Sequence, residues 1–219
     1  IVQHASDAIR TRDCIAMNRE AAIGNRLRWA SKFLTHGRKI VSVTPSSRWL
    51  SQAMCRDIDG SRPQVILELG SGMGPVTEAI SRCMHPESRL IAMEIDPDLH
   101  AMTMRRCPDV DVVLASAEEI DQILDDRGIQ TVDCFLSCLP TPSLPQEVNR
   151  RVLDVWSRRC HSKVFTQITQ IPWLYQSMYK KIFHQVEFQL VTRNLPPAGV
   201  YHCMELREDY ADLARLPGK

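Results

Sequence analysis

A glycine-rich segment is the clearest chemical feature of the sequence. Segment 70–74 reads GSGMG, follows the apolar run 64–69 and precedes a helical pattern that begins near Pro75. Glycines are needed where the backbone turns tightly and approaches a ligand closely. Glu68, two residues before the first glycine, adds an acid at the same strand end. Because open α/β sheets bind ligands at the carboxyl ends of their strands, this segment predicts a binding loop. A G-x-G-x-G loop by itself also occurs in dinucleotide-binding domains.

Polar residues at the ends of the next two apolar runs extend this predicted site. Glu94 lies at the end of the run 89–95, where its carboxylate can accept hydrogen bonds from both hydroxyls of a ribose. Ser116 and Ala117 come at the end of the third run. The serine can accept a hydrogen bond from an adenine ring, and the alanine amide can donate one.

Seven apolar runs predict the strands that position these residues. The first five runs are separated by helix-length segments, which indicates βαβ units and a parallel sheet. The last two runs are joined by a loop, TRNLPPAG, that is too short for a crossover helix and therefore predicts an antiparallel hairpin. The runs are 64–69, 89–95, 111–116, 132–138, 163–169, 186–191 and 200–206.

Segment 68–74 has the sequence ELGSGMG. With Glu94 and the terminal hairpin, this motif resembles that of the class I S-adenosylmethionine (SAM)-dependent methyltransferases. This resemblance implies a Rossmann-like α/β fold: a seven-stranded, mostly parallel sheet with an antiparallel last strand, plus N-terminal helices. SAM is then the cofactor and S-adenosyl-L-homocysteine its product. We predict two parts, an N-terminal helical segment, 1–62, that faces the membrane and the substrate, and a SAM-binding core, 63–219.

Further segments resemble a narrower family, the bacterial phospholipid N-methyltransferases, which methylate phosphatidylethanolamine towards phosphatidylcholine. These segments are 33–54, 132–145 and 193–201. Pro45-Ser46-Ser47 and the NLPPA sequence at 194–198 are the most specific parts. The family pattern usually has Gly before Pro-Ser-Ser and Tyr after the fifth strand, where this chain has Ser42 and Gln170. An ornithine-type aminolipid, or another primary amine, is therefore an alternative substrate.

The resemblance also implies a set of site residues. Those assigned to the cofactor are Pro45, Ser46, Ser47, Glu68, Gly70, Ser71, Gly72, Gly74, Glu94, Ile95, Ser116, Ala117, Glu118 and Ser137. Those assigned to the reacting nitrogen are Ser137, Leu139, Asn194 and Tyr201. Those assigned to the substrate are Trp29, Tyr175, Tyr179, Arg193 and Asn194.

The expected reaction is direct displacement, in which positioning does most of the work because the sulfonium methyl of SAM is already activated. A carboxylate beside the amine would favour the unreactive ammonium form. We therefore expect hydroxyl and carbonyl groups near Ser137, Leu139 and Tyr201 to orient the nitrogen. Tyr175 and Tyr179 suit a cationic product through cation–π attraction. Arg193 suits a lipid phosphate, and Asn194, in the stiff NLPPA loop, suits the amine or that phosphate.

Charge along the chain indicates an anionic partner. Segments 1–40 and 145–193 carry more Lys and Arg than Asp and Glu, whereas segment 41–144 is acidic. The pattern of residues 8–34 predicts an amphipathic basic helix, which can lie on an anionic membrane surface. We expect a cytoplasmic protein that associates peripherally with the inner face of the membrane. Scattered cysteines and histidines without ligand spacing predict a reduced protein with no metal site.

Three alternatives are consistent with parts of the sequence. The basic segments also suit a nucleic-acid methyltransferase, such as an rRNA adenine N6 enzyme. Such an enzyme needs an aromatic residue after the fourth strand to stack on a flipped base, and Thr141 occupies that place. A small-molecule amine methyltransferase and a SAM-binding homologue without activity are the other two alternatives. The intact glycine loop and Glu94 argue against loss of activity.

Overall fold

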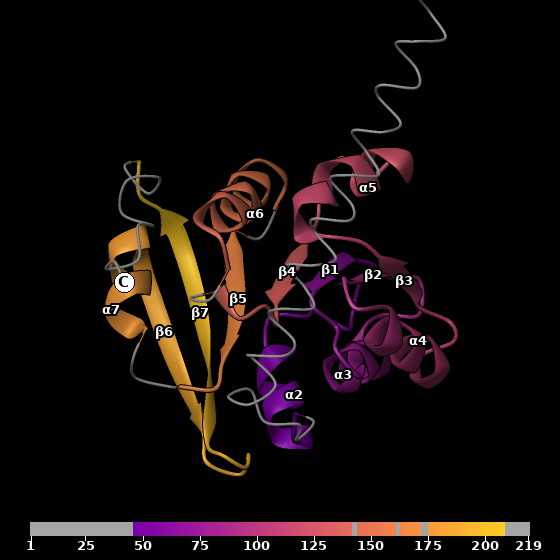
Figure 1. Ribbon diagram of the computed structural model, residues 1–219, viewed down its shortest axis with the longest axis horizontal. Helices are drawn as coiled ribbons and strands as arrows, with labels where there is room; N and C mark the ends of the chain where they lie inside the picture. The colour runs from indigo at the N-terminus through magenta and orange to yellow at the C-terminus, as the bar shows by residue number, and fades with distance from the viewer. Residues whose placement is uncertain (1–45, 142–143, 161–162, 172–174, 209–219) are drawn as a thin grey trace, which may run out of the picture. The chain divides into compact units, whose positions relative to one another are not determined.

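The computed structural model describes residues 46–141, 144–160, 163–171 and 175–208 (Figure 1). The predicted N-terminal helix, Trp29 and Pro45 lie outside these residues, so that their assigned roles stay predictions. The described residues belong to one compact unit, Thr44–Lys219.

Seven strands form a single sheet in the order β3-β2-β1-β4-β5-β7-β6 (Figure 1). They are β1 (Val65–Leu69), β2 (Arg89–Glu94), β3 (Asp111–Leu114), β4 (Cys134–Ser137), β5 (Val164–Thr169), β6 (Phe183–Val191) and β7 (Ala198–Leu206). The first five strands are parallel, and β7 is antiparallel to both β5 and β6. This topology confirms the predicted fold class.

Helices cover both faces of the sheet, as the βαβ connections require. They are α2 (Arg48–Met54), α3 (Pro75–Cys83), α4 (Pro97–Arg106), α5 (Ile120–Asp126), α6 (Gln146–Arg159) and α7 (Gln176–Ile182), with the 3-10 turn η1 (Ala117–Glu119). The buried residues of α2 and α3 pack with one face of the sheet. Those of α5, α6 and α7 pack with the other face. Central strands are therefore buried on both sides, which explains their continuous apolar sequence.

The boundary predicted after residue 62 is wrong, because α2 packs on the sheet unit. Leu50 and Met54 of α2 are at most 1% exposed. Just after the helix, Asp57 Oδ2 lies 2.6 Å from Nδ1 of His202, a buried residue of β7. Burial of these residues joins α2 to the core, so that the SAM-binding unit begins near Thr44.

The order of the strands fixes which loops can share a site. The carboxyl ends of β1, β2, β3, β4 and β5 lie along one edge of the sheet, because these strands are parallel. Thr169 at the end of β5 pairs with Gly199 at the start of β7. The loop between β6 and β7 therefore lies at the same edge. None of the described helices is long and apolar enough to span a bilayer.

Candidate functional site

The glycine loop begins at the carboxyl end of β1 and forms a cradle in the backbone. Gly70, Gly72 and Gly74 have φ angles of 77°, 60° and 81°, a region that L side chains rarely adopt. The amides of Gly70 and Ser71 donate to the Met93 carbonyl of β2, at 2.8 and 3.1 Å, which holds the loop across two strands. A Cβ built on Gly72 would meet no atom within 4 Å. The loop thus faces open space.

Glu94, at the end of β2, is fixed beside this open space. Its Oε2 accepts from the Gly72 amide at 2.8 Å, and its Oε1 accepts from the amides of Ile95 and Asp96 at 2.9 and 3.0 Å. Burial raises the pKa of the carboxyl, and these amides oppose the rise. A carboxylate has about four acceptor positions. The three amides leave capacity for a ribose hydroxyl, and the position of Glu94 fits its predicted role.

The predicted adenine segment lies next to Glu94. Leu114 pairs with Glu94 across β3 and β2, and the amide of Ala115 donates to the Glu94 carbonyl at 2.9 Å. Ser116 caps η1: its hydroxyl accepts from the Glu118 amide, and its own amide donates to the Glu119 carboxylate. Gly72, Glu94 and Ser116 are therefore brought together, although the Ser116 hydroxyl is already engaged in the cap.

Glu68 lies beneath the loop and does not face the open space. Its side chain is completely buried, and Oε2 accepts a hydrogen bond of 2.6 Å from the Thr77 hydroxyl of α3. Burial raises the pKa of Glu68 to about 7, and the nearby charge of Glu94 adds to the rise. Glu68 and Ile66 share one face of β1, so that the carboxylate points towards α3. The side chain of Glu68 joins β1 to α3 in this structure, and its contact with the cofactor stays a prediction.

The segment after β4 touches the glycine loop. A Cβ on Gly70 would lie 2.9 Å from Cδ2 of Leu139, so that Gly70 permits this contact. The Leu139 carbonyl accepts from Gln167 Nε2 and from the Thr141 amide, both at 2.8 Å. Thr141 Oγ1 in turn donates to Gln167 Oε1 at 2.8 Å. These bonds fix the segment but occupy the Leu139 carbonyl, which argues against its predicted role in orienting the amine.

Ser137 and Tyr201 also differ from prediction. The Ser137 hydroxyl is buried, has no hydrogen-bond partner among the described residues, and borders an internal cavity of about 20 Å³. Tyr201 is completely buried, with its ring 4.7 Å from that of Tyr179 and 5.0 Å from that of Phe188. Both side chains point into the core between the sheet and α6 and α7. The structure therefore does not support their contact with the reacting nitrogen.

The aromatic residues of α7 have different surroundings. Tyr179 is 3% exposed, and burial raises the pKa of its phenol well above the usual value. It is a core residue and not the predicted cation–π partner of the substrate. Tyr175, at the start of α7, is half-buried against the same core.

Asn194 is engaged within the protein instead of facing a ligand. It is 6% exposed. Its Oδ1 accepts from the Ser47 amide at 2.9 Å, and its Nδ2 donates to the Pro196 carbonyl at 2.7 Å. Asn194 thus ties the β6–β7 loop to the start of α2, and its contact with the substrate stays a prediction. This bond brings the two most specific sequence segments, Ser46-Ser47 and NLPPA, together at one edge.

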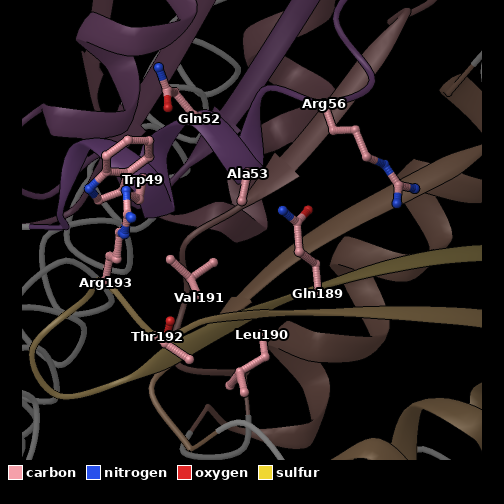
Figure 2. Close-up of a pocket in the computed structure, with 9 residues that line it drawn as sticks. All are labelled: Trp49, Gln52, Ala53, Arg56, Gln189, Leu190, Val191, Thr192 and Arg193. Carbon is pink, nitrogen blue, oxygen red and sulfur yellow. The ribbon is translucent and has the colours of Figure 1, made fainter.

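Sequence reasoning missed two parts of the site. Gln167 holds the Leu139 segment, and its only signal was a polar residue in the fifth apolar run. Trp49 lines a groove of about 460 Å³ between α2 and β6, and Arg193 lies beside it (Figure 2). The signal for Trp49 was an aromatic residue two positions after Ser47.

No protein-family model matches the chain. A curated relative, the ornithine lipid N-methyltransferase of Singulisphaera acidiphila, is 40% identical over 183 residues, which cover 82% of this chain and 95% of the relative.

Solved structures share the fold at low identity. TrmN from Thermus thermophilus matches with a TM-score of 0.54 and 17% identity, over 72% of this chain and 48% of its own, so that this chain spans about half of TrmN. The O-methyltransferase TomG from Streptomyces achromogenes, solved in complex with SAM, matches with a TM-score of 0.52 and 14% identity, over 72% of this chain and 78% of its own.

The open space at Gly72 beside the fixed carboxylate of Glu94 fits the predicted SAM site, in which Gly72 would lie under the ligand and Glu94 would face its ribose. The fold, this cofactor site and the relative that matches over nearly its full length agree. The chain therefore belongs to the lipid N-methyltransferase family of the class I SAM-dependent methyltransferases.

Proposed function

We propose that this protein methylates the side-chain amine of an ornithine-type aminolipid, with SAM as methyl donor. The observation that carries the proposal is the 40% identity to an ornithine lipid N-methyltransferase along 95% of that relative. Ser42 and Gln170, where the phosphatidylethanolamine-type pattern has Gly and Tyr, favour the same substrate. Phosphatidylethanolamine, our expectation from sequence, becomes the second substrate to be tested.

SAM supplies an electrophilic methyl group, and the protein must present a neutral amine to it. Residues 137–141 read SCLPT, which places no acidic side chain in the segment after β4. An acidic side chain in this segment would stabilise the ammonium form of the amine. Gln167 fixes this segment through its bonds to Leu139 and Thr141. In this mechanism, Gln167 is a positioning residue. It fixes the segment after β4, which the amine contacts when it binds.

The second part of the proposal is that the enzyme works at a membrane surface. Leu195, at the tip of the β6–β7 loop, is 78% exposed, and Ile171, just after β5, is 38% exposed. Both lie at the edge of the sheet that carries the glycine loop. Apolar side chains exposed beside a site are suited to insertion into the boundary of a bilayer. The basic segment 1–40 would add attraction to anionic head groups.

The decisive experiment offers several substrates to the purified protein with methyl-labelled SAM. Vesicles contain either ornithine lipid, phosphatidylethanolamine, or ornithine lipid whose amine has been acetylated, and a fourth sample contains total RNA. We expect label in ornithine lipid and none in the acetylated lipid, because acetylation removes the nucleophile. Label in phosphatidylethanolamine alone would overturn the ornithine assignment. Label in RNA alone would overturn lipid methylation altogether.

A further inference from the structure

Two arginines share one tryptophan at the start of α2. The guanidinium carbon of Arg48 lies 4.5 Å from the ring centroid of Trp49, and that of Arg193 lies 4.7 Å from it. Neither guanidinium has a carboxylate partner among the residues that the structure describes, and both arginines are exposed. Because two guanidinium groups lie at one ring with no acidic side chain between them, the electrostatic potential there is strongly positive.

Asn194 builds this cluster from segments far apart in the chain. Its bond to the Ser47 amide, 2.9 Å long, joins residues 147 positions apart. Arg193 precedes Asn194, and Arg48 and Trp49 follow Ser47, so that this one bond places all three side chains side by side. A second bond, from Asn194 to the Pro196 carbonyl, holds the loop that carries Arg193. The cluster is therefore fixed by the fold.

The cluster forms one end of the groove between α2 and β6. Figure 2 shows Arg193 beside Trp49 at one end and Arg56 at the other. Arg56 is paired with Glu187 at 2.8 Å and with Asp57 at 3.3 Å, so that its charge is balanced. The unbalanced charge of the groove thus lies at the Arg193 end.

We propose that Arg193 and Arg48, supported by the Trp49 ring, bind the oxyanion of the lipid substrate. An acylated ornithine keeps a carboxylate besides its side-chain amine, and a guanidinium matches a carboxylate with two parallel hydrogen bonds. The stacked indole holds the planar group in place, so that less freedom is lost on binding. Helix α2 contacts α3, which follows the glycine loop, and also contacts β6 and β7 (Figure 1), so that the carboxylate site and the glycine loop flank the same helix. This proposal rests on the proposed function, and the phosphate of phosphatidylethanolamine offers the same chemistry.

A test compares substrates with and without the anion. The substrates are a short-chain Nα-acyl-ornithine, its methyl ester, and a short-chain phosphatidylethanolamine. Arg193→Gln removes the charge, Arg193→Lys keeps the charge but not the planar fork, and Arg105→Gln, an exposed arginine of α4, is the matched control. We expect Arg193→Gln to lower kcat/KM for the free acid about ten- to a hundredfold, the loss typical of a charged hydrogen bond. The ester should be unaffected by the same variant, Arg193→Lys should fall between, and Arg105→Gln should match the wild type.

The outcomes separate this site from the proposed function. Equal losses on acid and ester, or no loss on any of the three substrates, overturn the oxyanion site. A loss confined to phosphatidylethanolamine supports the site and assigns it to phosphate. If the wild-type protein methylates none of the three, the proposed function fails. Calorimetric binding of the acyl-ornithine to wild type and Arg193→Gln then still decides the site: weaker binding by the variant supports it, and equal binding overturns it.

Discussion

The cofactor cradle can be tested with a pair of glycines that differ in place but not in local geometry. Gly72 has a φ of 60° and Gly128 a φ of 65°, and a Cβ on either would meet no atom within 4 Å. Gly72 lies in the loop after β1, whereas Gly128 follows α5 at the opposite edge of the sheet. Alanine at each position therefore introduces the same backbone strain and no clash within the protein.

The structure sets the expected magnitudes. Left-handed backbone costs an alanine about 1 kcal/mol, so that both Gly72→Ala and Gly128→Ala should lose the same stability. In a protein of this size that loss lowers Tm by roughly 2–4 °C. The added methyl at Gly72 also occupies the space assigned to SAM. We expect Gly72→Ala to bind SAM at least tenfold more weakly, or about 1.4 kcal/mol, and Gly128→Ala to bind it as the wild type does.

Thermal unfolding and calorimetric titration of SAM measure the two effects separately. If both variants bind SAM with the affinity of the wild type, the cofactor does not lie over Gly72, and the reasoning from the open cradle fails. If Gly72→Ala loses several times more stability than Gly128→Ala, any loss of SAM binding would reflect a damaged loop instead.

Four other predictions address separate parts of the site. Glu94→Ala should weaken SAM binding by about 1–3 kcal/mol in calorimetry, because a ribose hydroxyl loses its partner; unchanged affinity would remove Glu94 from the ribose site. Burial raises the pKa of Glu68 to about 7, so the folded protein holds this proton more tightly than the unfolded chain. The free energy of unfolding should fall as pH rises from about 4.5 to about 7, by up to about 3 kcal/mol, and urea titrations of Glu68→Gln should not show this slope. Gln167→Leu should lower kcat about tenfold and leave SAM affinity unchanged, because it frees the Leu139 segment without touching the cradle; a matching loss of SAM affinity would count against this role. Leu195→Asp should reduce sedimentation with anionic vesicles, whereas Met104→Asp, a change at an exposed residue near the end of α4, should not; equal sedimentation of both would contradict insertion of the loop.

Local sequence determined the fold and the cofactor loop. Strand, glycine turn and helix follow one another within segment 64–83, so that short-range spacing alone carries that signal. The short final connection likewise required an antiparallel hairpin, because a crossover needs a dozen residues or more. The prediction that Glu94 lies at a strand end came from the same local pattern. These features need no knowledge of which segments meet in space.

Tertiary structure decided which way side chains face and which distant residues meet. Central strands are apolar on both faces, so their sequence shows no alternation from which to tell that Glu68 points towards α3 or Ser137 into the core. Tyr201 was equally ambiguous, because a tyrosine in a strand can be buried or can line a site. The cluster of Arg48, Trp49 and Arg193 depends on a bond between segments 147 residues apart. Periodicity describes neighbours along the chain, and only packing of α2 against the sheet brings these three side chains together.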